Sequence, residues 1–182
     1  YIRGGSFDQT LLLIDGIKVE DPQTGHHTMN MALPIEVIER IEIIKGPAAR
    51  VFGQNAFTGA INIVTKNDAQ NVNELGFQVG SYNQQHFNGT LGHDFKNSSH
   101  IAHASINTSD GYRYNTDFQN QNYFLKNTFN KNNTPINVMG YFTDRKFGAN
   151  GFYASPAAIN QYEETQSSLV GISTAFTLKK LT

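Results

Sequence analysis

The sequence has no cysteine, no tryptophan and few charged residues, and these shortages exclude several classes of protein. Without cysteine there is no disulfide framework and no thiolate metal site. Charged residues make up 16% and the net charge is −1, so no basic surface indicates a nucleic-acid partner. No apolar run approaches the roughly 18 residues of a membrane-spanning helix. The mean hydropathy of the chain is low. This does not exclude membrane-spanning strands, because such strands alternate apolar and polar residues.

The chain divides near residue 67 into two parts of different composition. Residues 1–66 contain most of the isoleucine, three of the five prolines and several tight glycine motifs. Residues 67–182 are rich in Asn, Gln, Ser, Tyr and Phe, arranged in long alternating runs. We therefore expect two domains with different environments.

The first part is predicted to contain short strands and one short helix. Apolar runs and turn signals predict strands over residues 10–14, 17–19, 40–45 and 59–66, with Asp15-Gly16 as the first turn. Residues 33–40 predict a helix, because Pro34 suits a first turn and isoleucines recur at every third position. The glycines between residues 46 and 59 do not form a phosphate-binding loop, because no Lys-Ser/Thr pair follows them.

The second part shows six alternating segments that predict antiparallel strands. They cover residues 74–82, 86–95, 100–108, 122–130, 135–143 and 168–178. Several are about 9–11 residues long, which suits a tilted strand that crosses a bilayer. Short turns at one end alternate with longer connections at 109–119 and 144–164, a pattern typical of outer-membrane barrels.

Few residues suggest chemistry. Adjacent His26 and His27 face different ways in any regular element and have no third ligand nearby, so a polar loop tip explains them better than a metal site. Asp110, Asn115 and Asp117 offer oxygen ligands for Ca²⁺ in a loop, although their spacing is not that of an EF-hand. No carboxylate pair or nucleophile has the setting of an active site, and we do not expect an enzyme.

Four segments in order resemble the C-terminal part of the plug domain of TonB-dependent outer-membrane receptors. They are IRGG (2–5), LLLIDGIKVEDP (11–22), LPIEVIERIEIIKGP (33–47) and VFGQNAFTGAINIVTK (51–66). The resemblance implies a mixed fold: an α+β plug domain over residues 1–66, then about the first six strands of an antiparallel transmembrane β-barrel over residues 67–182. In this family 22 strands enclose a plugged lumen.

The resemblance also implies a function and partners. Such receptors lie in the lipid of the bacterial outer membrane and import a large scarce nutrient, such as a ferric siderophore or cobalamin, by energy-coupled transport. The TonB-ExbB-ExbD complex acts through an N-terminal segment. Because this sequence opens within a motif at Tyr1, we expect that segment to lie outside it. The sequence does not determine which nutrient is imported.

The resemblance places ligand-binding residues on the plug apices and on the outward loops. On the plug they are Gln23, His26, His27, Arg50, Phe52, Gln54 and Asn55, and on the loops Tyr112, Arg113, Tyr114, Phe152 and Tyr153. Arg3 and Arg40 are expected to lock the plug to barrel glutamates outside this sequence. The alternative is a soluble β-rich adhesion or carbohydrate-binding module, which would remain monomeric in buffer without detergent.

Overall fold

A computed structural model describes residues 9–20, 33–46, 51, 56–70, 72–131, 134–152 and 155–175. The chain forms two compact units, Tyr1–Lys66 and Asn67–Thr182, and each is described by itself. Within the described ranges, no helix has the length and apolar character needed to cross a membrane.

The first unit is built on a four-stranded sheet. Its strands are β1 (Thr10–Ile14), β2 (Ile17–Val19), β3 (Ile38–Lys45) and β4 (Gly59–Thr65), in the order β2-β1-β4-β3. β1 runs parallel to β4, while the other two pairs are antiparallel. Asp15 and Gly16 both have positive φ, as a two-residue hairpin turn requires. The expected strands in this part are confirmed, and β3 begins two residues earlier than predicted.

The helix predicted over residues 33–40 is wrong. Only Ile35–Val37 is helical, as a single 3-10 turn, and β3 starts at the next residue. The threefold spacing of isoleucines arises because one belongs to the turn and the others to the strand. Pairing with β4 gives this backbone ladder hydrogen bonds, and β-branched isoleucine fits a strand well. The described part of this unit therefore has no α-helix, which corrects the α+β expectation.

One buried cluster of the first unit lies on one face of this sheet, and the other side chains of β1 are buried as well. Leu11, Leu13 and Ala60 are buried together with Ala56, and Ile44 packs against them. These side chains alternate along β1 and meet partners from β3 and β4 at the same face. Burial of a leucine side chain contributes about 1.5–3 kcal/mol, so this small cluster is a principal source of stability for the sheet.

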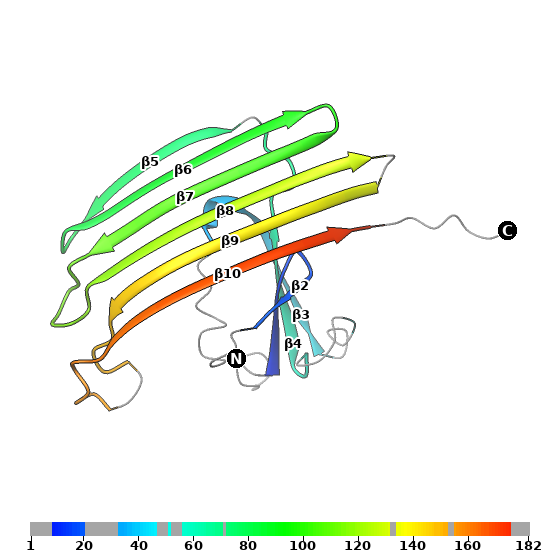
Figure 1. Cartoon of the computed structure of the whole chain (residues 1–182). Coiled ribbons are helices and arrows are strands. Elements are labelled where there is room, and N and C mark those ends of the chain that lie inside the picture. Colours follow the sequence, from blue (N-terminus) through cyan, green and yellow to red (C-terminus); the bar gives the residue numbers. More distant parts are fainter. Residues whose placement is uncertain are drawn as a thin grey trace. The chain divides into compact units, whose positions relative to one another are not determined.

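The second unit is a six-stranded antiparallel meander (Figure 1). Its strands are β5 (Asn73–Gly80), β6 (Gln84–Phe95), β7 (Ser98–Ser109), β8 (Phe118–Lys131), β9 (Thr134–Gly148) and β10 (Tyr162–Thr174). All six predicted strands are present. Three are markedly longer than predicted, and β10 begins six residues before the expected start because its polar N-terminal half pairs with β9.

The two faces of the meander differ in polarity. Leu75, Phe77 and Val79 share one face, as predicted, and all three are exposed. Phe77 lies opposite Phe87 on β6, and the two ring centroids are 4.3 Å apart. Further large apolar side chains on the other strands continue this face, and they are Leu91, Tyr123, Leu125, Phe142, Val170 and Ile172. This face of the meander is therefore apolar and exposed.

Candidate functional site

Three connections of the second unit gather at one end of the meander (Figure 1). They are the turn 81–83, the connection 110–117 and the described parts, 149–152 and 155–161, of the connection that follows β9. The antiparallel ladder places the start of β8 beside the end of β9, with Phe118 opposite Phe147. The first longer connection therefore ends next to the point where the second begins. We call this region the loop platform.

Asparagine side chains brace the loop platform. The Asn115 amide donates to the carbonyl oxygens of Ile159 (2.8 Å) and Gln161 (2.6 Å). The Asn150 amide returns a hydrogen bond to the carbonyl oxygen of Tyr114 at 2.6 Å. Asn115 has a positive φ of 52°, a conformation that asparagine tolerates better than most residues. The two connections are therefore one hydrogen-bonded structure rather than two independent loops.

Four of the predicted loop residues lie together on this platform. Tyr112 (64% exposed), Tyr114 (67%) and Phe152 (60%) present aromatic surface to solvent. The Tyr114 hydroxyl donates to Asn160, while the guanidinium of Arg113 lies 5.4 Å from the Tyr112 ring centroid and donates to the Asn150 carbonyl. The aromatic tips are thus accessible while their backbone is fixed.

The platform extends to the turn 81–83. The Asp110 amide donates to the Tyr82 carbonyl at 2.9 Å, and the rings of Tyr82 and Tyr112 meet edge to face at 6.5 Å. Sequence reasoning missed Tyr82, Asn150 and Asn160 as members of the site. The only signal for them is that Asn and Tyr are frequent in these connections.

Several predicted site residues lie outside the described residues. They are Arg3, Gln23, His26, His27, Arg50, Phe52, Gln54, Asn55 and Tyr153. The two plug apices and the Arg3 lock therefore stay predictions.

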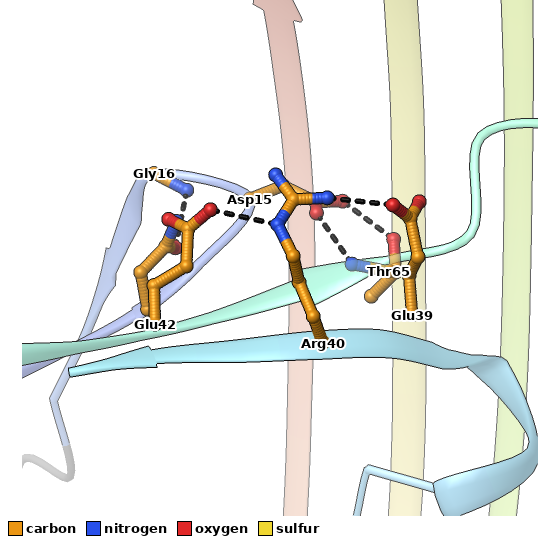
Figure 2. A network of polar contacts seen from close by, with 7 residues as sticks. Asp15, Gly16, Glu39, Arg40, Glu42 and Thr65 are labelled. Carbon is orange, nitrogen blue, oxygen red and sulfur yellow. Dashed lines mark hydrogen bonds and ion pairs between the residues drawn. The ribbon is translucent and has the colours of Figure 1, made fainter.

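Arg40 lies on β3 and binds two carboxylates of its own strand (Figure 2). Its guanidinium is 2.6 Å from Glu39 and 2.8 Å from Glu42. The Glu42 carboxylate also accepts a hydrogen bond from the Asn62 amide at 2.9 Å. Asn62 and then Arg40 lower the pKa of Glu42, while the hydrogen bond with Glu42 raises the pKa of Arg40. Arg40 is therefore held locally, and its pairing with a barrel glutamate remains a prediction.

The same network continues across the sheet to its first hairpin (Figure 2). Asn62 accepts the Gly16 amide at 3.0 Å. Both carboxylate oxygens of Asp15 are used by Thr65, which donates its backbone N–H at 2.8 Å and its hydroxyl at 2.6 Å. Asp15 thus fixes the residue where β4 ends. The sequence showed Asp15 only as a turn residue and gave no sign of its partner 50 residues away.

Two of the residues considered for Ca²⁺ take part in hydrogen bonds within the platform. The Asn115 amide group donates to two carbonyls, and the Asp117 carbonyl accepts the Gly148 amide. Among the described residues, no group of three or more His, Cys, Asp or Glu side chains is placed to hold a metal ion. The polar residues of these connections serve to brace the platform.

The comparisons with known proteins agree on one family. The family model described as TonB-dependent Receptor Plug Domain matches residues 1–60. The vitamin B12 transporter BtuB of Vibrio vulnificus is 37% identical over 65 residues, which are 36% of this chain and 10% of that protein. BtuB of Vibrio cholerae is 39% identical over 70 residues, or 38% and 11% of the two chains. The matched segment thus spans about a tenth of these relatives.

Solved structures share the fold. The siderophore receptor PirA from Pseudomonas aeruginosa has a TM-score of 0.61 at 24% identity and covers 82% of this chain and 28% of its own. P. aeruginosa FpvA bound to heterologous pyoverdines has a TM-score of 0.70 at 15% identity, covering 93% and 25%. These relatives are transporters and receptors, not enzymes.

Proposed function

We propose that this chain is part of a TonB-dependent receptor, with the plug domain matched in residues 1–60, and that the whole protein imports a large scarce nutrient across the bacterial outer membrane. The match of the plug domain is the observation that carries this proposal. The first unit is then the C-terminal part of the plug, and the second unit supplies the first six strands of a 22-stranded barrel.

The polarity of the meander supports a place in the membrane. Its exposed apolar face, which includes Leu75 and Val170, would meet lipid, and the opposite face would line the lumen. Such a sheet has two unpaired edges in isolation, and lipid does not tolerate unpaired backbone groups. The remaining strands of the barrel would pair with β5 and β10.

The nutrient is a cobalamin, a ferric siderophore or a molecule of similar size. The BtuB relatives are named as vitamin B12 transporters, and PirA is named as a siderophore receptor. The matches to BtuB span only about a tenth of those proteins, so the choice between these nutrients has to be argued from the residues of this chain. The loop platform suits a large ligand, because fixed aromatic side chains bury much area at little cost in conformational entropy.

The ligand contacts proposed on the platform come from Tyr112, Arg113, Tyr114 and Phe152, which the bracing amides hold in place. The remaining contacts proposed from the family resemblance are Gln23, His26, His27, Arg50, Phe52, Gln54, Asn55 and Tyr153.

Energy for transport would come from the TonB-ExbB-ExbD complex, acting on a segment N-terminal to the matched plug. Arg3 and Arg40 would pair with barrel glutamates and hold the plug until that segment is pulled. Because Arg40 already binds Glu39 and Glu42, a barrel glutamate would share its guanidinium with these carboxylates or replace one of them.

The test is ligand uptake by a strain that lacks its own nutrient receptors and expresses the full-length protein. Uptake of cyanocobalamin or a ferric siderophore should require TonB and should fall at least tenfold when Tyr112, Tyr114 and Phe152 are all changed to Ala. Leu91→Ala, on the outward apolar face, is the matched control and should leave uptake unchanged. Equal uptake with and without TonB would contradict the proposal.

A further inference from the structure

The polar face of the meander carries a cross-strand row of uncharged hydrogen-bonding side chains near the loop platform. Each of the strands β6 to β10 contributes one residue to this row, and each residue is paired with the next across the ladder. The members are Asn88, Ser105, Asn122, Thr143 and Ser167. Gly76 on β5 completes it, and its lack of a side chain leaves room for the Asn88 amide, which an added Cβ would meet at 2.5–2.9 Å.

A second row lies two residues closer to the loops on the same face. Its members are Gln78, His86, Asn107, Asn120, Arg145 and Thr165. The rows are about 6–7 Å apart along the strands. Across both rows Arg145 is the one permanent charge, and no member is a carboxylate. We call the two rows the polar wall.

The polar wall has hydrogen-bonding capacity to spare. The side-chain oxygen of Asn107 is buried and has no hydrogen-bond partner among the residues that the structure describes. The side chains of Asn88 and Asn120 are half-buried and form no hydrogen bond with any residue that the structure describes. An amide group that is partly shielded from water gains from a ligand that offers both a donor and an acceptor.

The rest of this face has a different character. In the middle of the sheet, the row of His103, Phe124 and Tyr141 is buried and largely aromatic. The wall is therefore confined to the end nearest the loop platform, where the accessible rings of Tyr112 and Tyr114 also lie. Amides and hydroxyls at the same end of the sheet as exposed aromatic rings suit a solute with polar edges and apolar faces.

We propose that the polar wall selects an uncharged ligand rich in amide and hydroxyl groups, and this inference rests on the proposed import function. An anionic ligand would lose hydration at the wall and find in return only Arg145, which already has an interaction within the protein. A cationic ligand would find no carboxylate in the two rows, and the nearest on this face toward the loops is Glu163 in the next row. A corrinoid with amide side chains and a neutral oligosaccharide share the required chemistry, and the experiment distinguishes them.

The experiment measures binding to the full-length receptor in detergent by isothermal titration calorimetry. The probes are cyanocobalamin, maltoheptaose and an anionic ferric catecholate siderophore. We expect one uncharged probe to bind at least tenfold more tightly than the anionic one. We expect the double variant Asn120→Leu/Asn122→Leu to weaken that binding at least tenfold. Asn137→Leu is the matched control, because it removes the same amide from the same face about 20 Å further along the sheet, and it should change binding less than twofold.

The other outcomes overturn the inference in separate ways. Tighter binding of the ferric siderophore, with uptake that requires TonB, would overturn the ligand class while the proposed import function stands. If Asn137→Leu weakened binding as much as Asn120→Leu/Asn122→Leu does, the ligand would depend on the general polarity of the face and not on the polar wall. Failure of both uncharged probes to bind a receptor that is correctly folded by circular dichroism would also refute the ligand class. Cyanocobalamin binding alone identifies a corrinoid, and maltoheptaose binding alone identifies an oligosaccharide.

Discussion

The two units bury the side chains of their strands differently. In the sheet of the first unit all five residues of β1 are buried, and Leu11 and Leu13 pack into one small cluster. In the meander, alternate residues such as Leu75 and Val170 are exposed on one face, and the polar residues occupy the other. The period of the pattern therefore identifies a strand, but it does not say whether the apolar face meets protein or lipid.

The largest expected effect contrasts one leucine from each unit. Leu13→Ala removes a side chain that is 1% exposed, and it should lower the free energy of unfolding of the first unit by about 2–5 kcal/mol through loss of packing. Leu75→Ala changes a side chain that is 92% exposed and should cost less than about 0.5 kcal/mol in detergent. Hydrogen exchange of β1 and β5 amides in the full-length receptor measures both, and equal losses would contradict the contrast.

The second prediction separates the two faces of the meander within one strand. Ala104→Arg places a charge on the apolar face and should destabilise the receptor in a bilayer by about 2–4 kcal/mol if the position lies near the midplane. Ser105→Arg places the same side chain on the polar face, where water or polar groups solvate it, and should cost much less. Reversible unfolding in lipid vesicles compares the two variants, and a larger loss in Ser105→Arg would reverse the assignment of the faces.

The third prediction compares a hydroxyl that binds a carboxylate with one that binds an imidazole. Thr65→Val removes the hydrogen bond to Asp15 in the first unit and should cost about 1.5–3 kcal/mol, as expected for a charged partner. Thr90→Val removes the 2.8 Å hydrogen bond to His103 in the second unit and should cost only about 0.5–1.5 kcal/mol. Local hydrogen exchange at β4 and β6 tests this order, and a larger loss at β6 would refute it.

The smallest expected effect is a dependence on pH confined to the first unit. The pKa of Glu42 is lowered in the folded state, chiefly by Asn62 and then by Arg40, so folding favours the ionised carboxylate. The resulting stability is present above the ordinary glutamate pKa of about 4.3 and is lost as the pH falls through the lower folded value. Exchange protection of β3 should decline below that pH in the native receptor and change less in Glu42→Gln. An identical decline in both would remove Glu42 as the cause.

Some features of the fold and of the loop platform could be predicted from the sequence, and others could not. The Asp15-Gly16 turn, the short strands and the six alternating segments were predictable, because turn chemistry and side-chain period are local properties. The aromatic tips Tyr112, Tyr114 and Phe152 were predictable as loop residues. The asparagines that brace them were not, because Asn115 and Asn150 find partners more than 30 residues away.

The sequence by itself indicated the resemblance to the family, the positions of most strands and which side chains of a strand share a face. Only the tertiary structure decided that residues 38–40 join β3 instead of a helix, that Arg40 is held between Glu39 and Glu42, and that Asp15 binds Thr65. The physical reason is the range of the interactions. Turns and alternation depend on neighbouring residues, whereas ladder pairing and the partners of Asp15 arise only when distant strands are brought together.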